Sequence, residues 1–161
     1  MVSDRLLHLQ TEVAAYYEQL AGKEKARRLA PLEEKVRIQQ QIRELQTELG
    51  SVERDYWLLW RSEAARLMIP EPEAEIVTAE ILSEVESLEL APKVQENEEL
   101  KVLLQEIKTE LTKPGIPGAG KLKAAIPLLP GVLSYELELD TEGLLRRTFP
   151  TFCKLASKLK K

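Results

Sequence analysis

Hydrophobic side chains in the N-terminal part of the chain recur at alternating spacings of three and four residues. This spacing is typical of the apolar seam of a coiled coil, which a partner helix must cover. The first seam consists of Leu6, Leu9, Val13, Tyr16 and Leu20, and the second of Ile38, Ile42, Leu45, Leu49, Val52, Tyr56 and Leu59. Folding the chain back near Ala30 and Pro31 places the two seams opposite each other. The pattern therefore predicts an antiparallel helical hairpin over residues 1–69.

The ends of these two helices carry recognisable capping signals. Ser3 or Asp4 can cap the first helix, which we expect at about 3–28. Pro31 interrupts the pattern and is acceptable in the first turn of a second helix at about 32–68. The second helix is the longer one, and its overhanging end is apolar, so something should cover it.

The segment 70–96 is acidic and follows the hairpin. Between Glu71 and Glu89 there are seven glutamates and no basic residue. Apolar residues at helical spacing predict a short amphipathic helix at about 73–89. The alternative is a mobile linker that becomes ordered only on a partner.

Residues 97–161 are predicted to form a small α-β-β-α module. Asn97 can cap a helix that reaches about residue 112. Polar and apolar residues alternate on both sides of Pro130-Gly131, which predicts a β-hairpin. The alternating apolar positions are Leu122, Ala124 and Ile126, then Leu133, Tyr135, Leu137 and Leu139. A last helix should follow, so the expected fold class is mainly α: a long antiparallel coiled-coil hairpin plus a small C-terminal α+β module.

Charge is unevenly distributed along the chain. The formal net charge is -4, with -9 over residues 1–112 and +5 over residues 113–161. A mildly acidic chain does not suggest nucleic-acid binding. The basic C-terminal third could meet an acidic surface, including the acidic stretch of its own chain. A single cysteine and a polar N-terminal sequence favour a cytoplasmic location.

Few residues suggest catalysis or cofactor binding. The stretch Gly115 to Lys121 matches the G-x4-G-K pattern of a phosphate-binding loop, but Leu122 follows where Ser or Thr would hold magnesium. Pro117 also removes one of the backbone donors such a loop needs. We therefore interpret the stretch as a linker. His8 is the only histidine and there is one cysteine, so the chain lacks a His and Cys cluster and we expect no metal site. Because no catalytic cluster of residues is recognisable either, we expect no cofactor and no enzymatic activity.

Aromatic residues are densest at the end of the second predicted helix. We predict a partner-binding site there, consisting of Tyr56, Trp57, Trp60, Leu67 and Met68. Buried tryptophans dominate the energetics of many interfaces. The alternative is that these side chains pack on the third helix or on the C-terminal module.

Five stretches resemble a known kind of helical hairpin: Tyr16-Tyr17-x-x-Leu20, Glu33-Glu34-Lys35, Ile38 to Ile42, Leu45 to Glu53, and Asp55-Tyr56-Trp57-x-Leu59. Residues 3–65 resemble the effector-associated adaptor segments of cyanobacterial signalling proteins, which are attached to STAND-type NTPases and to protease, TIR or caspase-like effectors. Residues 135–142 are similar to a tail of related cyanobacterial chains. The resemblance implies an adaptor role in bacterial signalling or conflict systems.

Three functional hypotheses follow, the third of which is a small enzyme or nucleotide binder at residues 115–121. In the first, the protein is a non-enzymatic adaptor that presents apolar helix faces and a sheet edge to a protein partner or to a second copy. In the second, it is a peripheral protein that uses its basic C-terminal third to bind an anionic membrane surface.

Overall fold

Helices account for all the regular structure in residues 1–139 and 144–159, the part of the chain that the computed structural model describes. Their bounds are α1 Asp4–Leu29, α2 Leu32–Ala64, α3 Glu71–Glu89, α4 Pro92–Gln95, α5 Glu98–Leu111, α6 Gly118–Ala125, the 3-10 turn η1 Ile126–Leu128, α7 Leu129–Leu139 and α8 Leu144–Leu159.

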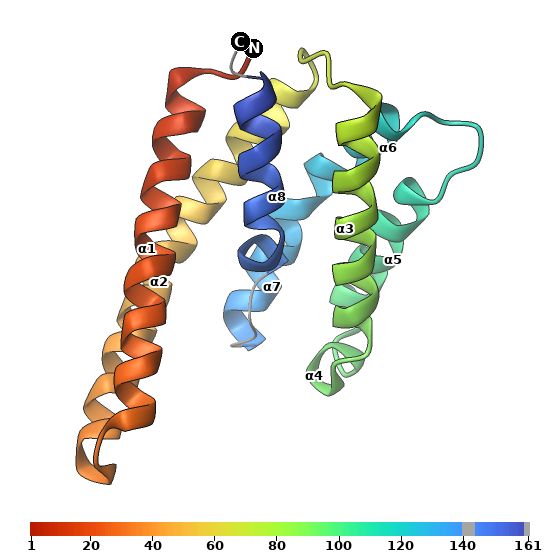
Figure 1. The fold of residues 1–161 in the computed structure, drawn as a ribbon. Coiled ribbons are helices and arrows are strands. Elements are labelled where there is room, and N and C mark those ends of the chain that lie inside the picture. Colours follow the sequence, from red (N-terminus) through yellow and green to blue (C-terminus); the bar gives the residue numbers. More distant parts are fainter. Residues whose placement is uncertain (140–143, 160–161) are drawn as a thin grey trace.

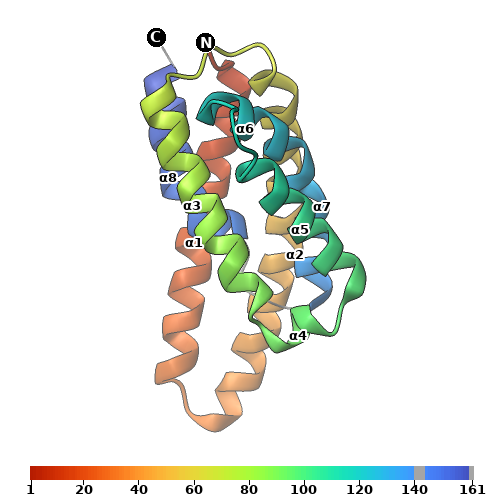
Figure 2. The same ribbon diagram turned by 90° about the vertical axis from the view of Figure 1, so that its right-hand side faces the viewer.

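The longer helices are arranged in two layers (Figures 1 and 2). One layer contains α1, α8 and α3 side by side, and the other contains α2, α7 and α5. Helix α8 contacts α1 on one side and α3 on the other, while α7 contacts both α2 and α5. The last helix of the chain thus connects the N-terminal hairpin to the middle of the sequence, and one buried apolar core runs through all these elements.

The predicted antiparallel hairpin is present as α1 and α2. Every residue of the two seams is buried or half-buried. Ser3 caps α1 by accepting a hydrogen bond from the backbone N–H of Leu6 at 3.1 Å. The Ser3 N–H donates to the Glu63 carboxylate at 2.8 Å, and Lys23 donates to Gln41 at 2.9 Å. These bonds connect opposite ends of the two helices, as an antiparallel pair requires.

The predicted C-terminal β-hairpin is wrong. Residues 118–139, which include both expected strands, form α6, η1 and α7, and the described part of the chain contains no strand. The buried residues recur at helical spacings of three and four: Leu122, Ala125, Ile126, Leu129, Val132, Leu133 and Glu136. Pro130-Gly131 is not a turn between strands. Pro130 lies in the first turn of α7, where a proline is tolerated.

The acidic segment is an ordered helix, α3, that lies against the basic helix α8. Arg147 of α8 is 3.1 Å from the carboxylate of Glu84, and Lys158 is 2.7 Å from Glu73. The acidic stretch is therefore helical, as the apolar spacing predicted, and it pairs with basic groups of its own chain.

Candidate functional site

The lower end of the helical hairpin extends beyond the other helices (Figure 1). We call residues 21–43, which form this end, the hairpin tip. Leu29 is 76% exposed, Leu32 80% and Val36 75%. Leu32 and Val36 are one helical turn apart, and Leu29 lies across the short connection from α1 to α2. The tip therefore presents three large aliphatic side chains to solvent.

The hairpin tip is also basic, although the whole chain is acidic. It carries seven lysines and arginines against three glutamates, a net charge of +4. An open groove beside Val36 is lined in large part by Arg27, Lys35, Arg37 and Arg43. Glu44 also lines the groove, and Glu33 and Glu34 lie between Leu32 and Val36, so the charge around the apolar side chains is mixed but mainly positive. Exposed apolar side chains bordered mainly by charges of one sign are typical of a surface that binds a partner.

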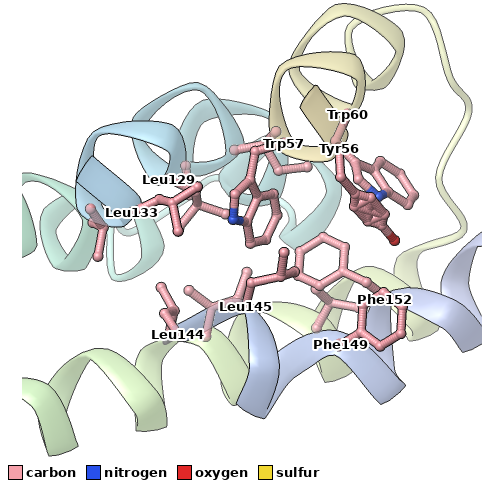
Figure 3. Close-up of a cluster of buried hydrophobic side chains, with 14 of the residues drawn as sticks. Tyr56, Trp57, Trp60, Leu129, Leu133, Leu144, Leu145, Phe149 and Phe152 are labelled. Atoms are coloured by element: carbon pink, nitrogen blue, oxygen red, sulfur yellow. The ribbon is translucent and has the colours of Figure 1, made fainter. Parts of the chain in front are cut away.

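The residues predicted to bind a partner lie elsewhere, and four of the five are inside the protein. Tyr56, Trp57, Trp60 and Leu67 are at most 3% exposed, whereas Met68 is 92% exposed. Figure 3 shows the three aromatic side chains of α2 pointing toward α8.

Aromatic residues of α8 cover the end of α2. The Phe152 ring lies edge-on to Trp57, with 4.9 Å between ring centroids, and 5.5 Å from Trp60. Phe149 contacts Tyr56 at 5.8 Å and Tyr17 at 5.2 Å. Contacts of this kind add to the free energy gained by burying the rings. The aromatic residues of α2 thus pack against α8, which lies within residues 97–161. This is the position given by the alternative interpretation, in which the C-terminal module covers them.

Two buried carboxyl groups lie where α1, α2, α7 and α8 meet. Glu53 of α2 is 6% exposed and accepts a hydrogen bond from the Tyr17 hydroxyl at 3.3 Å. Burial raises the pKa of Glu53 to about 7, although the Tyr17 hydrogen bond and the positive charge of Arg146 act in the opposite direction. Burial also raises the pKa of Tyr17, and the charge of Glu53 adds to this effect.

The second buried carboxyl group belongs to Glu136 of α7, which is 4% exposed. It accepts a hydrogen bond from the first backbone N–H of α8, at Leu144, over 2.9 Å. Burial raises the pKa of Glu136 to about 8, and the negative charge of Glu53 contributes to the shift. Near neutral pH these two groups therefore bind protons that exposed carboxyl groups would release.

The glycine-rich stretch 115–121 begins in the turn before α6 and ends in the first residues of that helix, not in the expected strand. Its first helical amides are already occupied by a carboxylate of the same chain. Glu71 accepts hydrogen bonds from the backbone N–H groups of Gly118 and, at 3.2 Å, Ala119. A Cβ atom at residue 118 would lie 2.8 Å from Glu71 Oε1, so glycine permits this approach. The anion held at this helix N-terminus is Glu71.

Glu71→Gln is expected to lower the free energy of unfolding by about 1–2 kcal/mol, because the bonds to the α6 amides lose their charge assistance. Urea unfolding followed by circular dichroism measures the change. Glu106→Gln, at an exposed position of α5, is the control and should be nearly neutral. Equal unfolding midpoints for the two variants would contradict the proposed role of Glu71.

The remaining candidate groups show no arrangement for metal binding. His8 is exposed and lies 3.4 Å from Glu12, one turn further along α1. Within the described ranges, no three His, Cys, Asp or Glu side chains are grouped so that they could hold a metal ion. In the same ranges, no helix has both the length and the apolar character needed to span a bilayer.

Sequence reasoning missed the hairpin tip, although one signal was available. Continuing the second seam upstream from Ile38 leads to Glu34 or Lys35, so Leu32 and Val36 do not belong to it. Apolar residues that lie off a seam and beside basic residues are candidates for exposure. The buried pair Glu53 and Glu136 had no such signal, because its members come from distant helices.

Comparison with known proteins gave no relatives: no protein-family model, curated protein or solved structure matches this chain.

Proposed function

We propose that this chain is a non-enzymatic interaction module that binds a protein partner through the hairpin tip. One observation carries the proposal: Leu29, Leu32 and Val36 are each at least 75% exposed on the part of the hairpin that extends beyond the other helices. The seam residues of the same two helices are buried or half-buried, so these three side chains contribute nothing to the internal core.

The chemistry of the tip supports binding rather than catalysis. It combines aliphatic side chains with a net charge of +4, which suits an acidic partner surface with an apolar centre. Interfaces of this kind gain affinity from the apolar contacts, and the charges increase the association rate and select the partner. The adaptor role suggested by the sequence is therefore kept, but with the hairpin tip as the binding surface in place of the aromatic cluster and the sheet edge.

The triple variant Leu29→Ser, Leu32→Ser, Val36→Ser is expected to keep its fold and to lose partner binding. Quantitative affinity capture from cells that express the protein should show at least about a tenfold loss of the partner, which corresponds to about 1.4 kcal/mol. The control replaces Met68, Ile76 and Val102, which are exposed elsewhere, by serine and should bind normally. A partner captured equally by all three proteins would refute binding through the tip.

A further inference from the structure

A second exposed end of the molecule has the opposite charge. We call residues 84–99, which comprise the end of α3, all of α4 and the start of α5, the acidic end. It contains six glutamates and one lysine, a net charge of -5. Leu90 within it is 76% exposed. The acidic end is therefore also an apolar position surrounded by charge, and its sign is complementary to that of the hairpin tip.

The two ends point in the same direction but lie on opposite sides of the molecule. In Figure 1 the hairpin tip is at the lower left and α4 at the lower right, and the tip reaches further down. Figure 2 shows the same difference in height from the side. One copy thus has a projecting basic end and a recessed acidic end, with α7 and α8 between them.

We propose that two copies of this chain form a two-fold symmetric dimer in which the hairpin tip of each lies against the acidic end of the other. A two-fold axis between the lower ends places each projecting tip beside the recessed α4 of its partner. Two identical contacts then form at once and the assembly closes, as in most homodimers. This inference names the partner of the proposed function and rests on it.

Charge complementarity favours a second copy over other occupants. Counted over the two segments, each contact brings a net charge of +4 against one of -5. Within the acidic end, Glu84, Glu89 and Glu98 pair with Arg147, Lys108 and Lys101 of the same chain, so Glu86 and Glu96 are the glutamates that we expect to face the partner's tip. The same contact covers Leu29, Leu32 and Val36 on one copy and Leu90 on the other. A lipid surface would accept only the tip and would leave the acidic end facing anionic headgroups. The dimer accounts for both exposed ends.

Charge reversal tests the dimer directly. The wild-type chain should sediment as a dimer at low ionic strength, and the dimer should weaken in about 1 M salt, where the Debye length is about 3 Å. Arg28→Glu with Lys35→Glu, or Glu86→Lys with Glu96→Lys, should raise the dissociation constant at least about tenfold. An equimolar mixture of the two double variants should form a heterodimer. In this mixed pair, one contact joins the reversed tip to the reversed acidic end, so the substituted charges again have opposite signs. The other contact joins an unchanged tip to an unchanged acidic end.

The matched control is Arg54→Glu with Arg61→Glu, at exposed positions of α2 outside the tip, and it should dimerise like the wild type. A wild-type chain that is monomeric at every concentration would overturn the dimer, as would a dimer that neither reversal weakens. So would a monomer that sediments with phosphatidylcholine–phosphatidylserine vesicles through its tip. If the chain is monomeric but partner capture still depends on the tip, the proposed function stands and only the dimer fails.

Discussion

Trp57→Ala is expected to lower the free energy of unfolding by about 3–5 kcal/mol, the usual cost of removing a large buried aromatic side chain. Trp57 is 2% exposed, and its ring centroid lies 4.9 Å from that of Phe152. The variant leaves a cavity between α2 and α8 at the centre of the cluster in Figure 3. Since domains of this size have a total stability of about 5–15 kcal/mol, the loss is a large fraction. Urea unfolding followed by far-ultraviolet circular dichroism measures it.

The control for this variant is Leu58→Ala, at the next position of the helix. Leu58 is 42% exposed, so its replacement should cost much less than that of Trp57. If Trp57→Ala does not fold, Phe152→Leu provides a milder change on the other side of the same contact. Equal stabilities for Trp57→Ala and Leu58→Ala would contradict the structure and would restore Trp57 as a candidate for partner binding.

The hairpin could be predicted from the sequence because the apolar spacing of one helix matches that of the other. Two long seams with matching spacing leave one antiparallel arrangement once Pro31 fixes the turn. The helix α3 and the caps at Ser3 and Asn97 were also predictable, because each depends on residues within a few positions. These features are determined by short-range spacing and by single hydrogen bonds.

The β-hairpin was predicted wrongly because period-two alternation over a few residues is a weak signal. Leu122 and Ile126, two of the alternating positions, are also four residues apart and so lie on one face of a helix. Composition was the better guide in this region, since residues 121–139 contain six leucines and only two β-branched residues, Ile126 and Val132. Such a composition favours helices over strands.

The position of the aromatic cluster could be predicted only in part. Its apolar character indicated burial or binding, but the choice depends on α8, which lies about ninety positions later in the chain. The same holds for the hairpin tip, whose exposure results from the other helices ending short of it. Packing between distant elements, which no local pattern encodes, decides which apolar surfaces are covered.

Raising the pH from about 5 to 8 is expected to destabilise the protein through Glu53 and Glu136. In the unfolded chain their carboxyl groups titrate near pH 4.5, whereas burial raises the pKa of Glu53 to about 7 and that of Glu136 to about 8. The folded state therefore holds more protons across this range, and the free energy of unfolding falls as the pH rises. For Glu53 alone, the free energy of unfolding should fall by an amount on the order of 3 kcal/mol.

Glu136→Gln should reduce this pH dependence and should be more stable than the wild type at pH 8. The amide oxygen can still accept the bond from the Leu144 N–H, but no buried charge develops. The control is Glu48→Gln, because Glu48 lies on α2 like Glu53 but is exposed. This variant should leave the pH dependence of the free energy of unfolding unchanged. Urea unfolding at several pH values gives the slope of the free energy of unfolding against pH.

Because the two buried groups interact, the double variant Glu53→Gln with Glu136→Gln should reduce this slope by an amount different from the sum of the two single effects. A wild-type stability that is constant or rises between pH 5 and 8 would show that these carboxyl groups are solvated, and that α7 and α8 do not close over α2 as described.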